Sequence, residues 1–142
     1  MPTIEALYAA GDSVKSGDAA AFDVILRGAD GGSDVSVRQL AATLLKAHAA
    51  VRLEAASAAL IALCEDAELR VRLTAIGALP SLCTAAGGDG AQLRRTTAAV
   101  LGAALRLSAA QTKEGRLALT VTTTLARERP AAAVHAALDL VD

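Results

Sequence analysis

Aromatic residues are almost absent from this chain, and proline is rare. Its 142 residues include one phenylalanine, one tyrosine, no tryptophan and three prolines. Strands favour aromatic and β-branched side chains, whereas alanine and leucine are the strongest helix formers. Because the sequence contains 36 alanines and 21 leucines, its composition predicts an all-α protein.

The chain also lacks an excess of charge of either sign. Fourteen basic residues stand against fifteen acidic ones, for a formal net charge of -1. This balance gives no electrostatic reason to expect nucleic acid as a direct partner. The longest apolar-rich run, residues 55–64, is far shorter than the roughly 18 residues of a membrane span, so no membrane partner is expected.

Residues that commonly hold metals or cofactors are scarce. Cys64 and Cys83 are too far apart for a metal or redox pair and lie in apolar stretches, which predicts buried free thiols in a reducing compartment. His48 and His135 have neither a second histidine four residues on nor a neighbouring glutamate. The glycines of 87–90 precede no Lys-Ser or Lys-Thr pair, which indicates an interhelical loop. We therefore expect no cofactor, no metal and no catalytic residue.

The spacing of apolar residues and of turn residues predicts eight helices joined by short connections. Thr3, Asp18 and either Ser33 or Asp34 are expected N-caps. The predicted helices cover about 3–14, 18–28, 34–48, 51–64, 68–84, 91–108, 112–127 and the residues from Pro130 onward. The stretch 117–126 is rich in threonine and could be a strand by propensity, but a helix is expected because its neighbours are helical.

One short sequence motif occurs twice, as SDVSVRQLAATLL at 33–45 and AELRVRLTAIGAL at 67–79. A shift of 34 places aligns Val37 with Val71, Arg38 with Arg72, Ala41 with Ala75 and Leu45 with Leu79. The predicted apolar faces are Val37, Leu40, Ala41, Leu44 and Leu45 in the first copy, and Val71, Thr74, Ala75, Ala78, Leu79 and Leu82 in the second. Because one hairpin cannot bury both of its apolar sides, a repeated helix pair stacks on the next. The sequence therefore predicts a single domain, residues 1–142, built as a right-handed α-solenoid of about three to four helical hairpins.

The repeated motif resembles the second helix of a HEAT repeat, which has the pattern D-x-x-V-R-x-x-A-x-x-x-L. Residues 34–45 and 68–79 are similar to it, and 115–125 is a degenerate third copy that keeps Arg116. The tetratricopeptide repeat has a matching length but needs aromatic residues that this chain lacks. The hairpins are therefore expected to be HEAT-like.

The two arginines of the repeat are the candidate site residues. Each follows the first valine of its apolar face, from where the side chain can bury its stem and reach an acidic turn. Their expected partners are Asp34, Asp66 and Glu68, which would form a structural ladder between repeats with Arg38 and Arg72. The alternative is that these arginines bind the carboxylates of a partner protein.

Several segments resemble the N-terminal part of the apoptosis inhibitor 5 family, also called antiapoptosis clone 11. They are MPTIEALY (1–8), VILRGADGG (24–32), RQLAATLL (38–45), LCED (63–66) and VRLTAIGALP (71–80). The resemblance implies a non-enzymatic scaffold of the nucleus or cytoplasm that suppresses programmed cell death through protein partners. The family's armadillo-like half and basic tail are missing, so this chain is expected to be the N-terminal part of a longer solenoid.

Two other functions stay open at this point. One is a HEAT-type enzyme or chaperone such as a bilin lyase, and the other is an adaptor associated with RNA processing. The last helix is expected to leave an apolar strip of Val134, Leu138 and Val141 facing a further repeat. Such a strip would also allow self-association.

Overall fold

The computed structural model describes residues 2–87, 90–108 and 112–141. Within these ranges the chain forms eight α-helices and two 3₁₀ turns and has no strand, which confirms the predicted all-α class. The helices are α1 (Ile4–Lys15), α2 (Phe22–Gly28), α3 (Val35–His48), α4 (Leu53–Leu63), α5 (Leu69–Ala85), α6 (Gly90–Ser108), α7 (Lys113–Glu128) and α8 (Pro130–Val141). The 3₁₀ turns are η1 (Ala19–Ala21) and η2 (Ala49–Val51). None of the described helices combines the length and the apolar character needed to cross a membrane.

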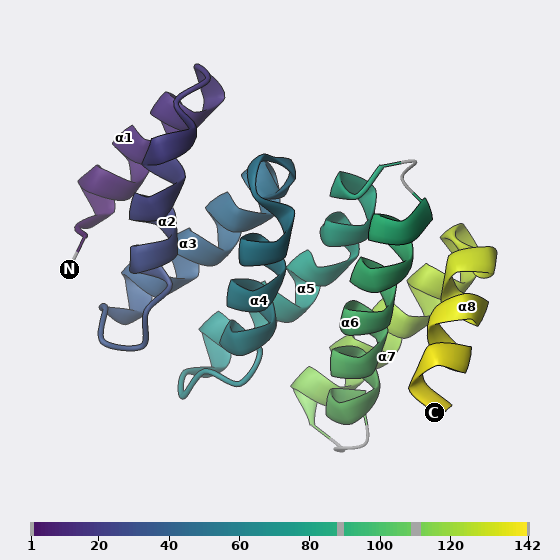
Figure 1. Cartoon of the computed structure of the whole chain (residues 1–142). Helices are drawn as coiled ribbons and strands as arrows, with labels where there is room; N and C mark the ends of the chain where they lie inside the picture. Colours follow the sequence, from purple (N-terminus) through teal and green to yellow (C-terminus); the bar gives the residue numbers. More distant parts are fainter. Residues whose placement is uncertain (1, 88–89, 109–111, 142) are drawn as a thin grey trace.

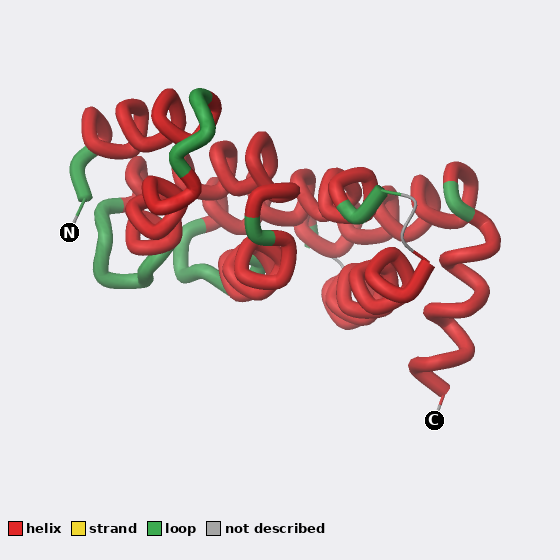
Figure 2. Tube along the Cα trace, turned by 45° about the horizontal axis from the view of Figure 1, so that its top comes forward, coloured by secondary structure: helices red, strands yellow, loops and turns green. Residues whose placement is uncertain are grey.

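The helices lie in two rows (Figures 1 and 2). The first row contains α1, α3, α5 and α7, and each helix packs against the next. The second row contains α2, α4, α6 and α8, which also contact one another in order. The last helix, α8, packs mainly on α6 and touches α7 less. The two ends of the chain therefore lie at opposite ends of the rows (Figure 1).

Two predicted N-caps are confirmed, but the second helix is shorter than expected. Thr3 caps α1 through its hydroxyl, which accepts a hydrogen bond in the first turn. Asp18 accepts a hydrogen bond from the N–H of Ala20, yet residues 19–21 wind as a 3₁₀ turn and α2 begins only at Phe22. None of the three alanines of the turn is buried, whereas Phe22 is fully buried. The regular helix therefore starts where a large side chain enters the core.

The two alanines that the repeat aligns lie in closely packed positions. Ala41 and Ala75 are both fully buried, the first beside Leu7 of α1 and the second in the large central core. A one-carbon side chain in the middle of a face lets neighbouring helices approach closely. The buried residues are Val37, Arg38, Ala41, Ala42 and Leu45 on α3, and Val71, Ala75, Ile76, Ala78, Leu79, Leu82 and Cys83 on α5. Of the predicted faces, Leu40, Leu44 and Thr74 are only half-buried.

The threonine-rich stretch of α7 is helical, as expected. The hydroxyls of Thr120, Thr122 and Thr123 donate to the carbonyl oxygens four residues earlier, at 3.0–3.2 Å. Each hydroxyl thus finds its partner inside the helix. Because Val121 and Leu125 bury their side chains in the core, tertiary packing outweighs the strand propensity of threonine.

Two expectations concern positions outside the described residues. They are the centre of the predicted loop, residues 88–89, and the side chain of Val141.

Candidate interaction surface

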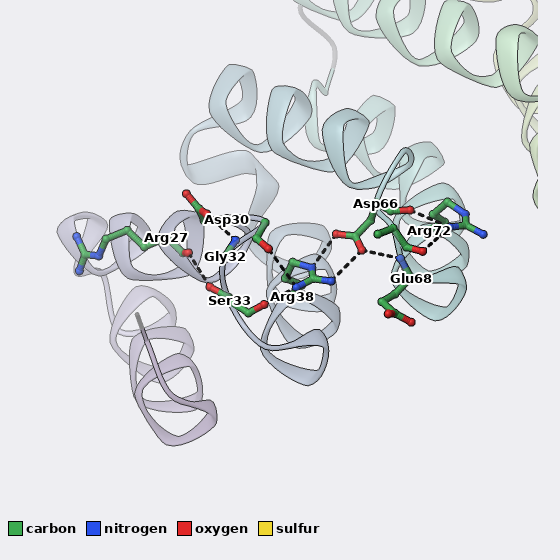
Figure 3. Close-up of polar contacts among 10 residues, drawn as sticks. Arg27, Asp30, Gly32, Ser33, Arg38, Asp66, Glu68 and Arg72 are labelled. Atoms are coloured by element: carbon green, nitrogen blue, oxygen red, sulfur yellow. Dashed lines mark hydrogen bonds and ion pairs between the residues drawn. The ribbon is translucent and has the colours of Figure 1, made fainter.

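Arg38 joins α3 to the turn before α5. Its Nε and Nη2 atoms donate to the two carboxylate oxygens of Asp66, at 2.7 and 3.0 Å (Figure 3). The residues are 28 positions apart in the sequence, and their side chains are only 8% and 6% exposed. This is the two-pronged geometry that arginine forms with carboxylates. The pair therefore links two consecutive helices of the first row.

The same guanidinium also holds the loop before α3. Its Nη1 atom donates to the carbonyl oxygen of Ser33 and, at 3.4 Å, to that of Gly31. The hydrogen bond with Asp66 raises the pKa of Arg38 above its ordinary value, although burial opposes this. One charged side chain thus connects a loop, a helix and the next turn.

Asp66 is held as a carboxylate. Burial by itself would raise the pKa of this group, but hydrogen bonds from Arg38 and from the N–H of Glu68 lower it. The positive charges of Arg38 and Arg72 act in the same direction, and the pKa of Asp66 falls below its usual value. The buried pair is therefore ionic at neutral pH.

Arg72 binds the turn before its own helix, α5, and also contacts the next first-row helix, α7. Its Nη1 atom donates to the carbonyl oxygens of Asp66 and Ala67, at 2.8 and 3.0 Å (Figure 3). Its Nη2 atom lies 3.6 Å from Oε1 of Glu114, in the first turn of α7. Sequence reasoning missed Glu114. The available signal was an acidic residue near the start of the next first-row helix, since Asp66 lies in the turn just before α5 and Glu114 in the first turn of α7.

The other residues of the predicted ladder make different contacts. Asp34 occupies the N-cap position of α3, but its side chain makes no capping hydrogen bond, and its charge only adds to the field that raises the pKa of Arg38. Glu68 is exposed and contributes its backbone N–H to Asp66. Arg116, the arginine of the third copy, is exposed as well. The structure thus brings Arg38, Asp66 and Arg72 together.

A set of polar side chains crosses from α3 to α5. Gln39 donates through Nε2 to the Thr74 hydroxyl at 3.3 Å, and Arg70 donates through Nη2 to the Ser36 hydroxyl at 3.3 Å. Ser36, Thr43 and Arg70 are exposed, while Gln39 and Thr74 are half-buried. We call these five residues the α3–α5 polar surface. Its cross-helix hydrogen bonds hold polar groups in place on a surface open to solvent.

The two thiols do not belong to this surface. Cys64 and Cys83 are free and buried, as the sequence predicts. Burial raises the pKa of Cys64 to about 12 and also raises that of Cys83. Over the described residues, no three histidine, cysteine or acidic side chains gather where a metal ion could bind.

Comparison with known proteins places the chain in a family. No curated protein sequence matches it. The family model for apoptosis inhibitory protein 5 (API5) matches residues 3–125, from the cap of α1 to the buried part of α7. The match confirms the family resemblance of the N-terminal segments and extends it beyond the last of them, which ends at residue 80. Because it covers most of the sequence, the chain belongs to the apoptosis inhibitory protein 5 (API5) family.

Proposed function

We propose that this chain is a non-enzymatic scaffold that binds other proteins and acts in negative regulation of programmed cell death. The observation that carries this proposal is the family match over residues 3–125, because the family is described as inhibitory toward apoptosis. The scaffold works in the nucleus, the cytoplasm or both.

The proposed architecture is a right-handed, HEAT-like α-solenoid. Support comes from the repeated motif, whose two copies lie on α3 and α5, and these helices are neighbours in the first row. The Arg38–Asp66 pair joins these two units through buried atoms. In a solenoid, stability comes from contacts between adjacent repeats, and the surface along the stack stays open for partners. By the same reasoning, we propose that the residues of the predicted ladder stabilise the contact between adjacent repeats.

The α3–α5 polar surface is the proposed contact region, and its occupant is a protein segment that presents carboxylates. The hydroxyl of Ser36 is the contact described for the Arg70 guanidinium, which carries five N–H donors and is exposed. Its remaining donors suit a carboxylate, and a two-pronged pair would fix the orientation of the partner. Arg38, by contrast, has its donors occupied by Asp66 and by backbone carbonyls.

The test compares two charge reversals in cells under apoptotic stimulus. Arg70→Glu changes the proposed surface, while Arg27→Glu changes an exposed arginine on α2 in the other row. We expect expression of the wild-type chain and of the Arg27→Glu control to lower caspase activation, and Arg70→Glu to lose the effect together with its cross-linked protein partners. Equal activity of the two variants would exclude this surface, and a wild-type chain without effect would exclude the cell-death role.

Two further experiments test the two alternative functions, an adaptor associated with RNA processing and a bilin lyase. Nuclease treatment before capture leaves a protein scaffold's partners in place, whereas loss of all partners indicates an RNA-associated adaptor. Co-expression with bilin and an apo-phycobiliprotein produces no attached chromophore if the chain is a scaffold. A coloured product would overturn the proposal in favour of a bilin lyase.

A further inference from the structure

The helix α8 carries two large apolar side chains on the side that faces solvent, where His135 is also exposed. Ala133 and Ala136 are buried, while Val134 and Leu138 are 58% and 60% exposed. No charged residue occurs from Pro130 to Leu138. Large apolar side chains that lie together on a protein surface commonly mark an interaction site. The exposed side of α8 therefore has the character of a contact surface.

A hollow of about 330 Å³ lies beside this exposed side, between α6, α7 and α8. Its lining includes Leu101, Leu105, Thr122, Ala126, Val134 and Ala137. The hydroxyl of Thr122, the one polar side-chain group of the lining, donates to the carbonyl oxygen of Ala118 within its own helix. Leu105 is 46% exposed and stands on the α6 side of the hollow, across from Val134 on α8. The hollow therefore suits apolar side chains, because it offers no side-chain partner to a polar ligand.

We propose that the occupant is a second copy of this chain, and that Val134 and Leu138 of one copy insert into the hollow of the other. The two side chains are four residues apart, so they form one ridge on α8. The ridge and the hollow share α8, so a single surface carries both the projecting and the receiving part. That self-complementarity is what a two-fold contact requires, since each copy then contributes the same patch.

The charge of this surface supports the same occupant. A charged partner would lose hydration against an uncharged ridge and an uncharged hollow and gain no opposite charge in return. A second copy brings an equally uncharged surface. Apolar side chains are also concentrated here: of the seven large ones exposed in the described part of the chain, Leu105, Leu119, Val134 and Leu138 lie on α6–α8. The contact does not rest on the proposed scaffold role, because it follows from the exposed side chains of α8 and from the lining of the hollow and not from the family match.

The first experiment measures mass as a function of concentration by sedimentation equilibrium, from about 1 to about 200 µM. We expect the wild-type chain to shift from monomer to dimer within this range. The double variant Val134→Glu/Leu138→Glu should weaken the dimer at least about tenfold, because it places carboxylates in the contact. The matched control, Tyr8→Glu/Val51→Glu, changes two other exposed apolar side chains away from α8 and should leave the dimer unchanged.

The second experiment locates the contact without relying on destabilising charges. Val134→Cys should give a disulfide-linked dimer under mild oxidation, and Tyr8→Cys should not. Circular dichroism at each step shows whether the variants keep their helices. A wild-type chain that stays monomeric throughout would overturn the proposal and leave the surface to a different partner. A dimer that survives the double glutamate variant would overturn it as well, because its contact would lie elsewhere.

Discussion

Arg38 Nε lies 2.7 Å from Asp66 Oδ2, and both side chains are almost completely enclosed by the protein. The structure contains a useful contrast in Arg52 and Asp23, an ion pair whose side chains are 43% and 54% exposed. The charges are the same in kind, but water can solvate only the second pair after one partner is removed. The two pairs should therefore respond very differently to the same substitution.

We expect Arg38→Met to lower the free energy of unfolding by about 3 kcal/mol, because it leaves the Asp66 carboxylate buried and unpaired. Arg52→Met should cost no more than about 1 kcal/mol, since an exposed pair contributes little and the cation over the Phe22 ring adds little more. Urea denaturation at neutral pH measures both. Equal losses for the two variants would show that the buried pair has no special role in stability.

The lowered pKa of Asp66 predicts how this stabilisation depends on pH. The unfolded chain binds the proton near the ordinary value of 3.8, and the folded chain binds it only at lower pH. The contribution of Asp66 is therefore complete above about pH 4 and is lost as the pH falls through the folded-state pKa.

The measurement compares the wild type with Asp66→Asn from neutral to acidic pH. The difference in free energy of unfolding should be largest near neutrality and should shrink below about pH 4, while the contributions of other carboxylates cancel. A difference that stays constant across this range would mean that Asp66 has the same pKa in both states.

The repeated motif predicted which residues pack between first-row helices, because buried residues recur along a helix at its regular spacing of about 3.6 residues. Ala41 and Ala75 are fully buried at the places that the 34-residue shift aligned. Pro80 lies inside α5, and the helix continues through it to Ala85, in agreement with the predicted range of about 68–84. A proline in a helix interior costs about 3 kcal/mol, and the burial of Leu82 and Cys83 beyond it, which the sequence also predicted, offsets part of that cost.

The sequence predicted which kinds of residue form the candidate site, but it predicted less well which arginine pairs with which acidic residue. Arg38 had three acidic residues near the expected helix starts, and the choice of Asp66 depends on how the turn before α5 folds back. Glu114, which faces Arg72, lies 42 positions further on and so outside the 34-residue repeat. The separation is larger mainly because α5 and α6 have 17 and 19 residues where α3 and α4 have 14 and 11. Longer helices displace the next partner along the sequence without moving it away in space.

The buried thiols should be unreactive in the folded protein. With the pKa of Cys64 raised to about 12 from 9.0, its thiolate fraction at pH 8 falls about a thousandfold, and burial blocks access as well. Cys83 is fully buried beside the Thr97 hydroxyl, and its pKa is raised too. A disulfide reagent should label neither thiol in buffer and both in guanidinium chloride. Rapid labelling of the native chain would contradict the burial of these residues.

Gly28 and Gly77 are predicted to respond in opposite directions to substitution by alanine. A Cβ at position 28 would lie 2.8 Å from Cδ2 and 3.0 Å from Cδ1 of Leu7, whose side chain is fully buried. We expect Gly28→Ala to lower the free energy of unfolding by about 1–3 kcal/mol. A Cβ at position 77 meets nothing within 4 Å on the exposed side of α5, so Gly77→Ala should raise stability by about 0.5–1 kcal/mol through helix propensity.

A double-mutant cycle identifies the cause of the effect at Gly28. Leu7→Ala removes the methyl groups that the new Cβ would meet, so adding Gly28→Ala in that background should cost little or nothing. The free energies come from urea denaturation of the four chains, wild type included. If the cost of Gly28→Ala is the same with and without the Leu7 side chain, the close approach of α1 and α2 is not what selects glycine at this position.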